Sequence, residues 1–117
     1  MLRTLRKHLT LAAVGGSQQV VTGNRRPLGY QQLTLDSSTA QALTLPTAIP
    51  GYTANFCVID NQDASVAVRW RDDGTDPTTA LGNRIPAGGQ FQYAGDLAKI
   101  KFIGESATPK LNVSVYA

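Results

Sequence analysis

The side chains that could carry chemistry in this sequence are few and lie far apart. His8 is the only histidine and Cys57 the only cysteine, and Cys57 stands in the apolar run Phe56–Ile59, where we expect a buried thiol. A Ser/His/Asp triad would have to use His8, which is surrounded by basic residues. A zinc site without a second histidine or cysteine would depend mostly on carboxylates, which is unusual. These residue types predict a protein that is not an enzyme and that has no cofactor.

Three carboxylates lie close together in the segment that contains Asp72, Asp73 and Asp76. Oxygen ligands that converge from a tight loop suit Ca²⁺, but the spacing does not match an EF-hand. The alternative is an Asp/Gly turn whose carboxylates accept hydrogen bonds from backbone N–H groups or pair with Arg69 and Arg71. We favour the turn and predict no metal ligand.

Trp70 lies between two arginines, Arg69 and Arg71. An aromatic ring beside guanidinium groups could stack on a sugar or a nucleotide base. However, Val66, Val68 and Trp70 alternate with other residues, and this period of two places Trp70 on the core side of a strand. Arg69 and Arg71 then lie on the opposite face, where we expect them to contact a partner.

The basic residues are concentrated near the start of the chain. Residues 1–35 contain five basic residues and no acidic one, whereas residues 36–117 contain six basic and eight acidic residues. A basic segment attracts an acidic surface, which nucleic acid, anionic lipid or protein could supply. The charges are too sparse for a nucleic-acid-binding tract, so we expect a protein partner. The residues that we predict to contact it are Arg3, Arg6, Lys7, Arg25, Arg26, Arg69 and Arg71.

The N-terminal segment superficially resembles a secretory signal peptide. Its apolar stretch, Leu9–Val14, is too short for one, and no segment approaches the roughly 20 apolar residues that span a bilayer. We therefore expect no membrane partner. Residues 1–26 are predicted to form a basic arm that is extended or contains a short helix, because leucines and an alanine recur at helical spacing from Leu2 to Ala12.

Short alternating segments separated by turn-forming residues occupy the rest of the chain. Tyr52–Ile59 and Val66–Arg71 predict a hairpin, since the turn-rich segment Asp60–Ser65 joins them. About eight short strands at this spacing are typical of a sandwich, a jelly roll or a small barrel. We predict one all-β domain over residues 27–117, a small β-sandwich or jelly roll of antiparallel strands. The other candidate strands are residues 18–22, 28–35, 42–45, 90–93, 99–102 and 111–116.

Several distinctive strings occur in the second half of the chain. They are Val68–Thr78, which contains Arg-Trp-Arg-Asp-Asp-Gly, together with Ile85–Phe91, Gly95–Leu97, Lys101–Ile103 and Lys110–Ser114. Over residues 46–117 the sequence resembles small virion proteins of tailed bacteriophages. The resemblance implies a β-sandwich or jelly-roll subunit that decorates or cements the capsid. It implies no catalytic or binding residue.

The expected function is therefore that of a structural virion protein. Its expected partners are the major capsid protein or other virion subunits, including further copies of itself. An arm that becomes ordered on a neighbour adds contact area to a small domain, and many copies multiply a modest affinity. The absence of disulfides agrees with assembly in the host cytoplasm. The alternatives are a tail or baseplate component, and a β-sandwich that presents Trp70, Tyr52 or Tyr93 to a receptor carbohydrate.

Overall fold

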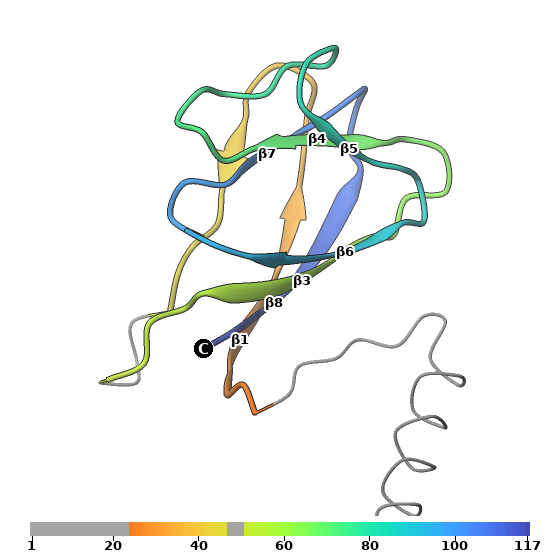
Figure 1. The fold of residues 1–117 in the computed structure, drawn as a ribbon. Helices are drawn as coiled ribbons and strands as arrows, with labels where there is room; N and C mark the ends of the chain where they lie inside the picture. Colours follow the sequence, from red (N-terminus) through yellow and green to blue (C-terminus); the bar gives the residue numbers. More distant parts are fainter. Residues whose placement is uncertain (1–23, 47–50) are drawn as a thin grey trace, which may run out of the picture.

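The chain folds into two antiparallel β-sheets of four strands each (Figure 1). The computed structural model describes residues 24–46 and 51–117. Sheet A contains, in spatial order, β1 (Pro27–Thr34), β8 (Lys110–Tyr116), β3 (Phe56–Asn61) and β6 (Gln90–Ala94). Sheet B contains β2 (Gln41–Ala42), β7 (Lys101–Gly104), β4 (Val68–Arg71) and β5 (Asn83–Ile85). The prediction of an all-β domain with about eight short antiparallel strands is confirmed.

The strand order is that of a jelly roll. Sheet A has the order β1-β8-β3-β6 and sheet B the order β2-β7-β4-β5, so the chain crosses between the sheets at six of its seven connections. Only the β4–β5 connection joins two neighbouring strands of one sheet. This winding leaves each sheet with one face toward the other sheet and one face outward.

The predicted hairpin between Tyr52–Ile59 and Val66–Arg71 is wrong. The first of these segments contributes β3 to sheet A and the second contributes β4 to sheet B, so the connection after Asn61 passes from one sheet to the other. β3 also begins later than predicted, at Phe56. Alternation shows which residues face inward, but it does not identify the neighbouring strand.

Asn61 is the last residue of β3, where the chain leaves sheet A. Its side chain is fully buried, and its amide nitrogen, which shares two hydrogens among three acceptors, lies within hydrogen-bond distance of the carbonyl oxygens of Val66 (3.0 Å), Ile85 (3.3 Å) and Pro86 (3.2 Å). Its side-chain oxygen accepts the backbone N–H of Asp63 at 3.2 Å. A buried amide must be hydrogen-bonded, so Asn61 holds the start of the connection against the end of β5.

β2 is shorter than the segment 42–45 predicted for it and covers only Gln41–Ala42. Beyond it, the backbone of Thr44 pairs with a side chain: the amide of Gln31 donates to the Thr44 carbonyl at 2.8 Å and accepts its N–H at 2.9 Å. The Gln31 side chain thus forms the two hydrogen bonds with the Thr44 backbone that a neighbouring strand would otherwise form. The predicted strand at residues 18–22 lies outside the described residues.

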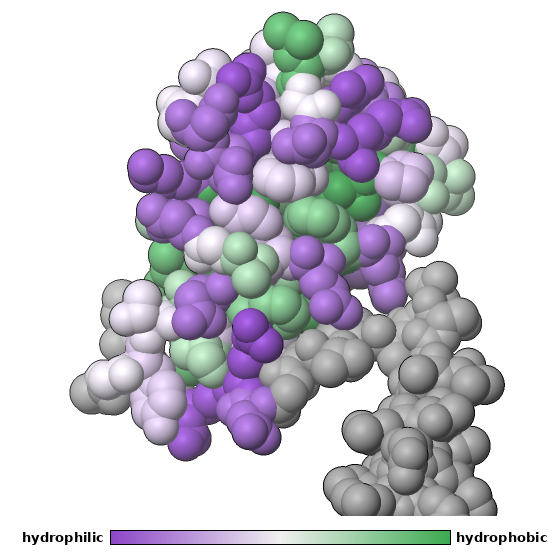
Figure 2. All heavy atoms as spheres, in the orientation of Figure 1, coloured by the Kyte–Doolittle hydropathy of each residue, from purple (hydrophilic) through white to green (hydrophobic). Residues whose placement is uncertain are grey.

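The core lies between the sheets and includes the inward-facing residues of both. The largest fully buried side chains include Phe102, Leu35, Ile59, Ile85, Leu97, Ile100 and Leu111. Cys57 is also buried, as predicted, and burial raises the pKa of its thiol to about 12, so the thiol stays protonated at neutral pH. In Figure 2, hydrophobic residues are visible between the hydrophilic surfaces of the two sheets.

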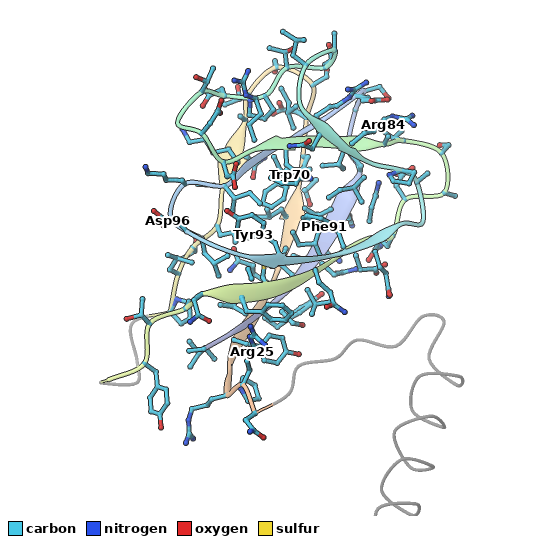
Figure 3. The ribbon with its side chains drawn as sticks, viewed as in Figure 1. Arg25, Trp70, Arg84, Phe91, Tyr93 and Asp96 are labelled. Carbon is cyan, nitrogen blue, oxygen red and sulfur yellow. The ribbon has the colours of Figure 1, made fainter. Side chains whose placement is uncertain are left out.

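Trp70 packs on the core side of β4, as predicted. Its ring centroid lies 5.0 Å from that of Phe91 and 5.6 Å from that of Tyr93, both on β6 (Figure 3). The Tyr93 hydroxyl donates a hydrogen bond to Asp72 at 2.6 Å. Burial and this contact raise the pKa of Tyr93 to about 12. The three rings thus close the sandwich at the β6 edge of sheet A.

Candidate interaction surface

The outer face of sheet B carries charges that are already paired. Glu105 accepts hydrogen bonds from Arg69 at 2.6 Å and from Arg84 at 2.9 Å. Lys101 contacts Asp76 at 3.0 Å. Together with the pair formed by Arg71 and Asp73, these are the four ion pairs found within residues 24–46 and 51–117. Figure 2 shows hydrophilic residues gathered over this part of the molecule.

These pairs stabilise the charged forms of the acids. Hydrogen bonds from Arg84 and then Arg69 lower the pKa of Glu105, and the Arg71 guanidinium lowers the pKa of Asp73. Arg69 and Arg71, which we predicted to contact a partner, therefore have partners within the chain. A ligand would have to compete with these contacts.

The carboxylates of Asp72, Asp73 and Asp76 do not converge on one point. Asp72 accepts the Tyr93 hydroxyl, and Asp76 accepts the Lys101 ammonium. Asp73 accepts both the Arg71 guanidinium and the backbone N–H of Thr75, as expected of a turn. Within the described part of the chain, no group of three or more His, Cys, Asp or Glu residues is placed to hold a metal ion. The calcium alternative therefore gains no support.

The β4–β5 connection lies over part of the outer face of sheet B. Ile103 is on this face, opposite Arg69, yet it is only 4% exposed. It forms the floor of a cleft of about 340 Å³ between residues 37–40 and 76–79. Pro77 in this connection is buried as well. The β4–β5 connection thus covers part of the outer face of sheet B.

The outer face of sheet A is different because it is almost free of charge. The strand register places two rows of side chains across it: Tyr30, Ser114, Val58 and Gln92 in one row, and Gln32, Asn112, Asp60 and Gln90 in the other. We call these eight residues and the neighbouring Gln62 the amide face. Asp60 is its only charged residue, and Lys110 follows in the next row. Four of its members are glutamines.

Asn112 is the centre of a hydrogen-bond network on the amide face. Its side-chain oxygen accepts the Tyr30 hydroxyl at 2.5 Å and the Gln32 amide at 3.0 Å. Its nitrogen donates to Gln62 at 2.7 Å and to Asp60 at 3.3 Å. The Tyr30 side chain is anchored by its hydroxyl, while the residue remains 64% exposed. The network therefore holds an exposed aromatic ring on a flat polar surface.

Arginine and aromatic side chains meet at one end of this face. The guanidinium carbon of Arg25 lies 4.1 Å from the ring centroid of Phe56, and that of Arg26 lies 4.5 Å from the ring centroid of Tyr52. Arg26 also donates to the Tyr52 hydroxyl at 3.1 Å. Tyr116 packs beside Phe56 with their ring centroids 5.9 Å apart. These five residues form what we call the arginine–aromatic end.

The backbone fixes this end to sheet A. The N–H of Arg26 donates to the Ala117 carbonyl at 2.7 Å, and the Ala117 N–H donates to the Arg26 carbonyl at 3.0 Å. This pair extends the β1–β8 ladder by one step. Arg25 and Arg26, which the sequence assigned to the arm, thus pack on the domain, and Figure 3 shows Arg25 on the side of sheet A away from sheet B. Arg3, Arg6 and Lys7 lie outside the described residues.

The arginines of the described residues therefore fall into two groups. Arg69, Arg71 and Arg84 pair with carboxylates, whereas Arg25 and Arg26 stack on aromatic rings. Within residues 24–46 and 51–117 neither Arg25 nor Arg26 forms an ion pair. These two guanidinium groups are the ones that remain for an external anion.

Comparison of the chain with protein-family models, curated proteins and solved structures finds no match. The resemblance to bacteriophage virion proteins therefore rests on the strings in the second half of the sequence. Among the described residues, no helix is long and apolar enough to cross a membrane.

Sequence reasoning did not find the amide face. Outward-pointing glutamine, asparagine and serine are ordinary on a half-buried strand and attract no attention singly. The available signal was negative: Leu28–Thr34 contains no charged residue, and neither does Gln90–Ala94. A soluble domain usually carries charges at its outward strand positions, so their absence from two strands of one sheet could have indicated a contact surface.

Proposed function

We propose that this protein is a non-enzymatic structural protein of a tailed-bacteriophage virion, which binds the capsid surface and stabilises it as a cement or decoration subunit. The observation that carries the proposal is the contrast between the two outer faces. The charges of sheet B are paired within the chain, whereas the amide face of sheet A is nearly uncharged and ends in two arginines without an acidic partner among the described residues.

The composition of the amide face supports a protein contact. The centres of protein–protein interfaces are depleted of charged residues and enriched in tyrosine. Tyrosine with serine and asparagine also provides contact area and adaptable hydrogen bonds at little entropic cost. By analogy alone, the jelly-roll order agrees with this role, because the fold is frequent in viral capsid domains.

The charge distribution supports an additional contribution from the N-terminal segment. The described residues contain eight basic and eight acidic residues, so the net charge of +3 of the whole chain comes from Arg3, Arg6 and Lys7. The amide face would then lie against the major capsid protein or a neighbouring copy, with this segment on an acidic surface nearby. The protein would join the virion in the host cytoplasm.

The proposal is tested by mass spectrometry of purified virions and by reconstitution on heads that lack the protein. We expect the full chain in many copies per head. Deletion of residues 1–23 should lower the occupancy, while the melting temperature stays within the range of the full chain. This deletion leaves Arg26 in its contact with Ala117. A chain that is absent from the virions and does not bind the heads would overturn the proposal.

A carbohydrate-binding function is a second candidate, now favoured by one observation. Trp70 packs against two rings and Tyr93 is 8% exposed, so neither offers a free ring face to a sugar. Tyr30, in contrast, is exposed beside several amide groups, an arrangement that suits a sugar ring and its hydroxyls. In a glycan array this function requires binding that Tyr30→Ala abolishes and that Tyr52→Ala, a change of the other exposed tyrosine, leaves intact.

A further inference from the structure

Two neighbouring arginines are held on aromatic rings in a way that leaves hydrogen-bond donors available. The guanidinium carbons of Arg25 and Arg26 lie over the rings of Phe56 and Tyr52, and a guanidinium carries five N–H donors, more than these contacts use. Among the described residues, the Arg25 side chain forms no hydrogen bond, and the Arg26 side chain donates one, to the Tyr52 hydroxyl. Both therefore retain donors in the fork geometry that fits a carboxylate.

Contacts within the chain restrain these donors before any ligand binds. Two backbone hydrogen bonds join Arg26 to Ala117, and the Tyr52 hydroxyl restrains its guanidinium. Arg25 rests on Phe56, which is 5% exposed and packs beside Tyr116. Side chains that are already ordered lose less conformational entropy on binding, which raises their affinity for an anion.

We infer that Arg25 and Arg26 form a carboxylate clamp that binds an acidic peptide segment of the partner protein. The inference rests on the proposed function and specifies the chemistry of the surface that the arginine–aromatic end would meet. The partner segment would place one carboxylate on each guanidinium and continue over the amide face. Exposed amides and hydroxyls there can bond with a peptide backbone and neutral side chains.

The charge distribution favours a protein over a nucleic acid. A nucleic acid presents a regular row of phosphates and needs a continuous basic track. The described residues contain equal numbers of basic and acidic residues, and Asp60 is the charged residue of the adjoining amide face. Two isolated guanidinium groups beside a surface with little charge match a short acidic segment better.

Fluorescence anisotropy with a labelled decaglutamate peptide and the full chain tests the clamp. We expect the double variant Arg25→Gln/Arg26→Gln to bind about tenfold more weakly than the double variant Lys99→Gln/Lys110→Gln, which removes the same charge at two exposed lysines elsewhere on the domain. Arg25→Lys/Arg26→Lys keeps the charge and should recover only part of the affinity, because lysine lacks the planar fork. Equal affinity of the two glutamine variants would overturn the inference.

Two further measurements complete the test. Thermal unfolding checks that each variant is folded; should Arg25→Gln/Arg26→Gln unfold, Tyr52→Leu keeps both arginines, removes one ring, and must still weaken decaglutamate binding. A labelled deoxythymidine decamer serves as the nucleic-acid probe. Binding of this oligonucleotide as tight as that of decaglutamate would also overturn the inference.

The outcomes separate the clamp from the proposed function. If the chain is absent from virions but Arg25 and Arg26 are needed to bind decaglutamate, the clamp stands and the virion role fails. If the chain is present in virions but the two glutamine variants bind decaglutamate equally, the clamp alone fails.

Discussion

The two outer faces of the sandwich are built from the same kind of alternating strand, but they use their outward positions differently. In sheet B, arginine and lysine occupy several of these positions, and each of them forms an ion pair with a carboxylate, as Arg69 and Arg84 do with Glu105. Sheet A fills them with amides and hydroxyls around Asn112. The difference shows that the charges of a strongly charged face can be satisfied within the chain; under the proposed function, it is the nearly uncharged face that meets the partner.

The largest effect on stability that we expect is that of replacing Asn61, the buried last residue of β3. Asn61→Leu removes its hydrogen bonds and leaves the buried carbonyl of Ile85 and the partly buried carbonyls of Val66 and Pro86 without that donor. The free energy of unfolding should fall by about 2–4 kcal/mol in urea denaturation. The control is the exposed neighbour Gln62→Leu, expected to change it by about 0.5 kcal/mol. Equal losses would contradict the role given to Asn61.

An added positive charge on the amide face should weaken a protein contact there. Ser114→Arg puts a guanidinium between Tyr30 and Val58. We expect the affinity for heads lacking the protein to fall about 100-fold, since the new charge would be desolvated at the interface. The matched control is Ala80→Arg in the β4–β5 connection, which should bind as the native chain does. A similar loss in both variants would show that the faces are equivalent.

The free energy of unfolding should depend on pH in the acid range because of the ion pairs of sheet B. The pKa of Glu105 is lowered in the folded state from its ordinary value of 4.5, so the unfolded chain binds more protons at acid pH. The stabilisation that the ionised Glu105 carboxylate contributes is therefore fully present above pH 4.5, and it is lost as the pH falls through the lowered pKa of the folded state. Urea midpoints measured from about pH 7 to about pH 3 should decline in the lower part of this range. Midpoints that rise there would contradict the pairing.

The smallest effect follows from neutralising the same acid. Glu105→Gln weakens the contacts to Arg69 and Arg84, and because exposed ion pairs are weak we expect a melting temperature about 3–5 °C lower. The acid decline described above should become shallower. Occupancy on heads should not change, and the control Asp76→Asn should affect the melting temperature less. A strong loss of occupancy in Glu105→Gln would assign the contact surface to sheet B.

Much of the fold could be predicted from alternation, whereas the pairing of strands could not. Phe91 and Tyr93 point inward from β6, and Val113 and Val115 are buried in β8, as period two requires. The error arose in Asp60–Ser65, which the sequence presents as a turn-rich connection, whereas Asn61 within it is the buried last residue of β3. Two of its hydrogen-bond partners, Ile85 at the end of β5 and Pro86 directly after it, are 24 and 25 residues away, so local patterns gave no sign of them.

The candidate site shows the same division between local pattern and distant contact. Arg69 and Arg71 were chosen because they flank Trp70, but the sequence does not show that Glu105, 36 residues farther on, accepts a hydrogen bond from Arg69. Arg25 and Arg26 were chosen for charge alone. Their distinguishing property, the stacking on Phe56 and Tyr52, depends on residues more than 20 positions away.

The sequence by itself determined the strand-forming alternation, the single buried thiol and the excess of positive charge before residue 36. These properties depend on residue type and on spacing along the chain. Which charges are paired, and which face carries almost no charge, depends on the tertiary structure. Tyr30 and Asn112 are 82 residues apart in the chain and share a hydrogen bond, because electrostatic contacts act over ångströms in space and not over positions in sequence.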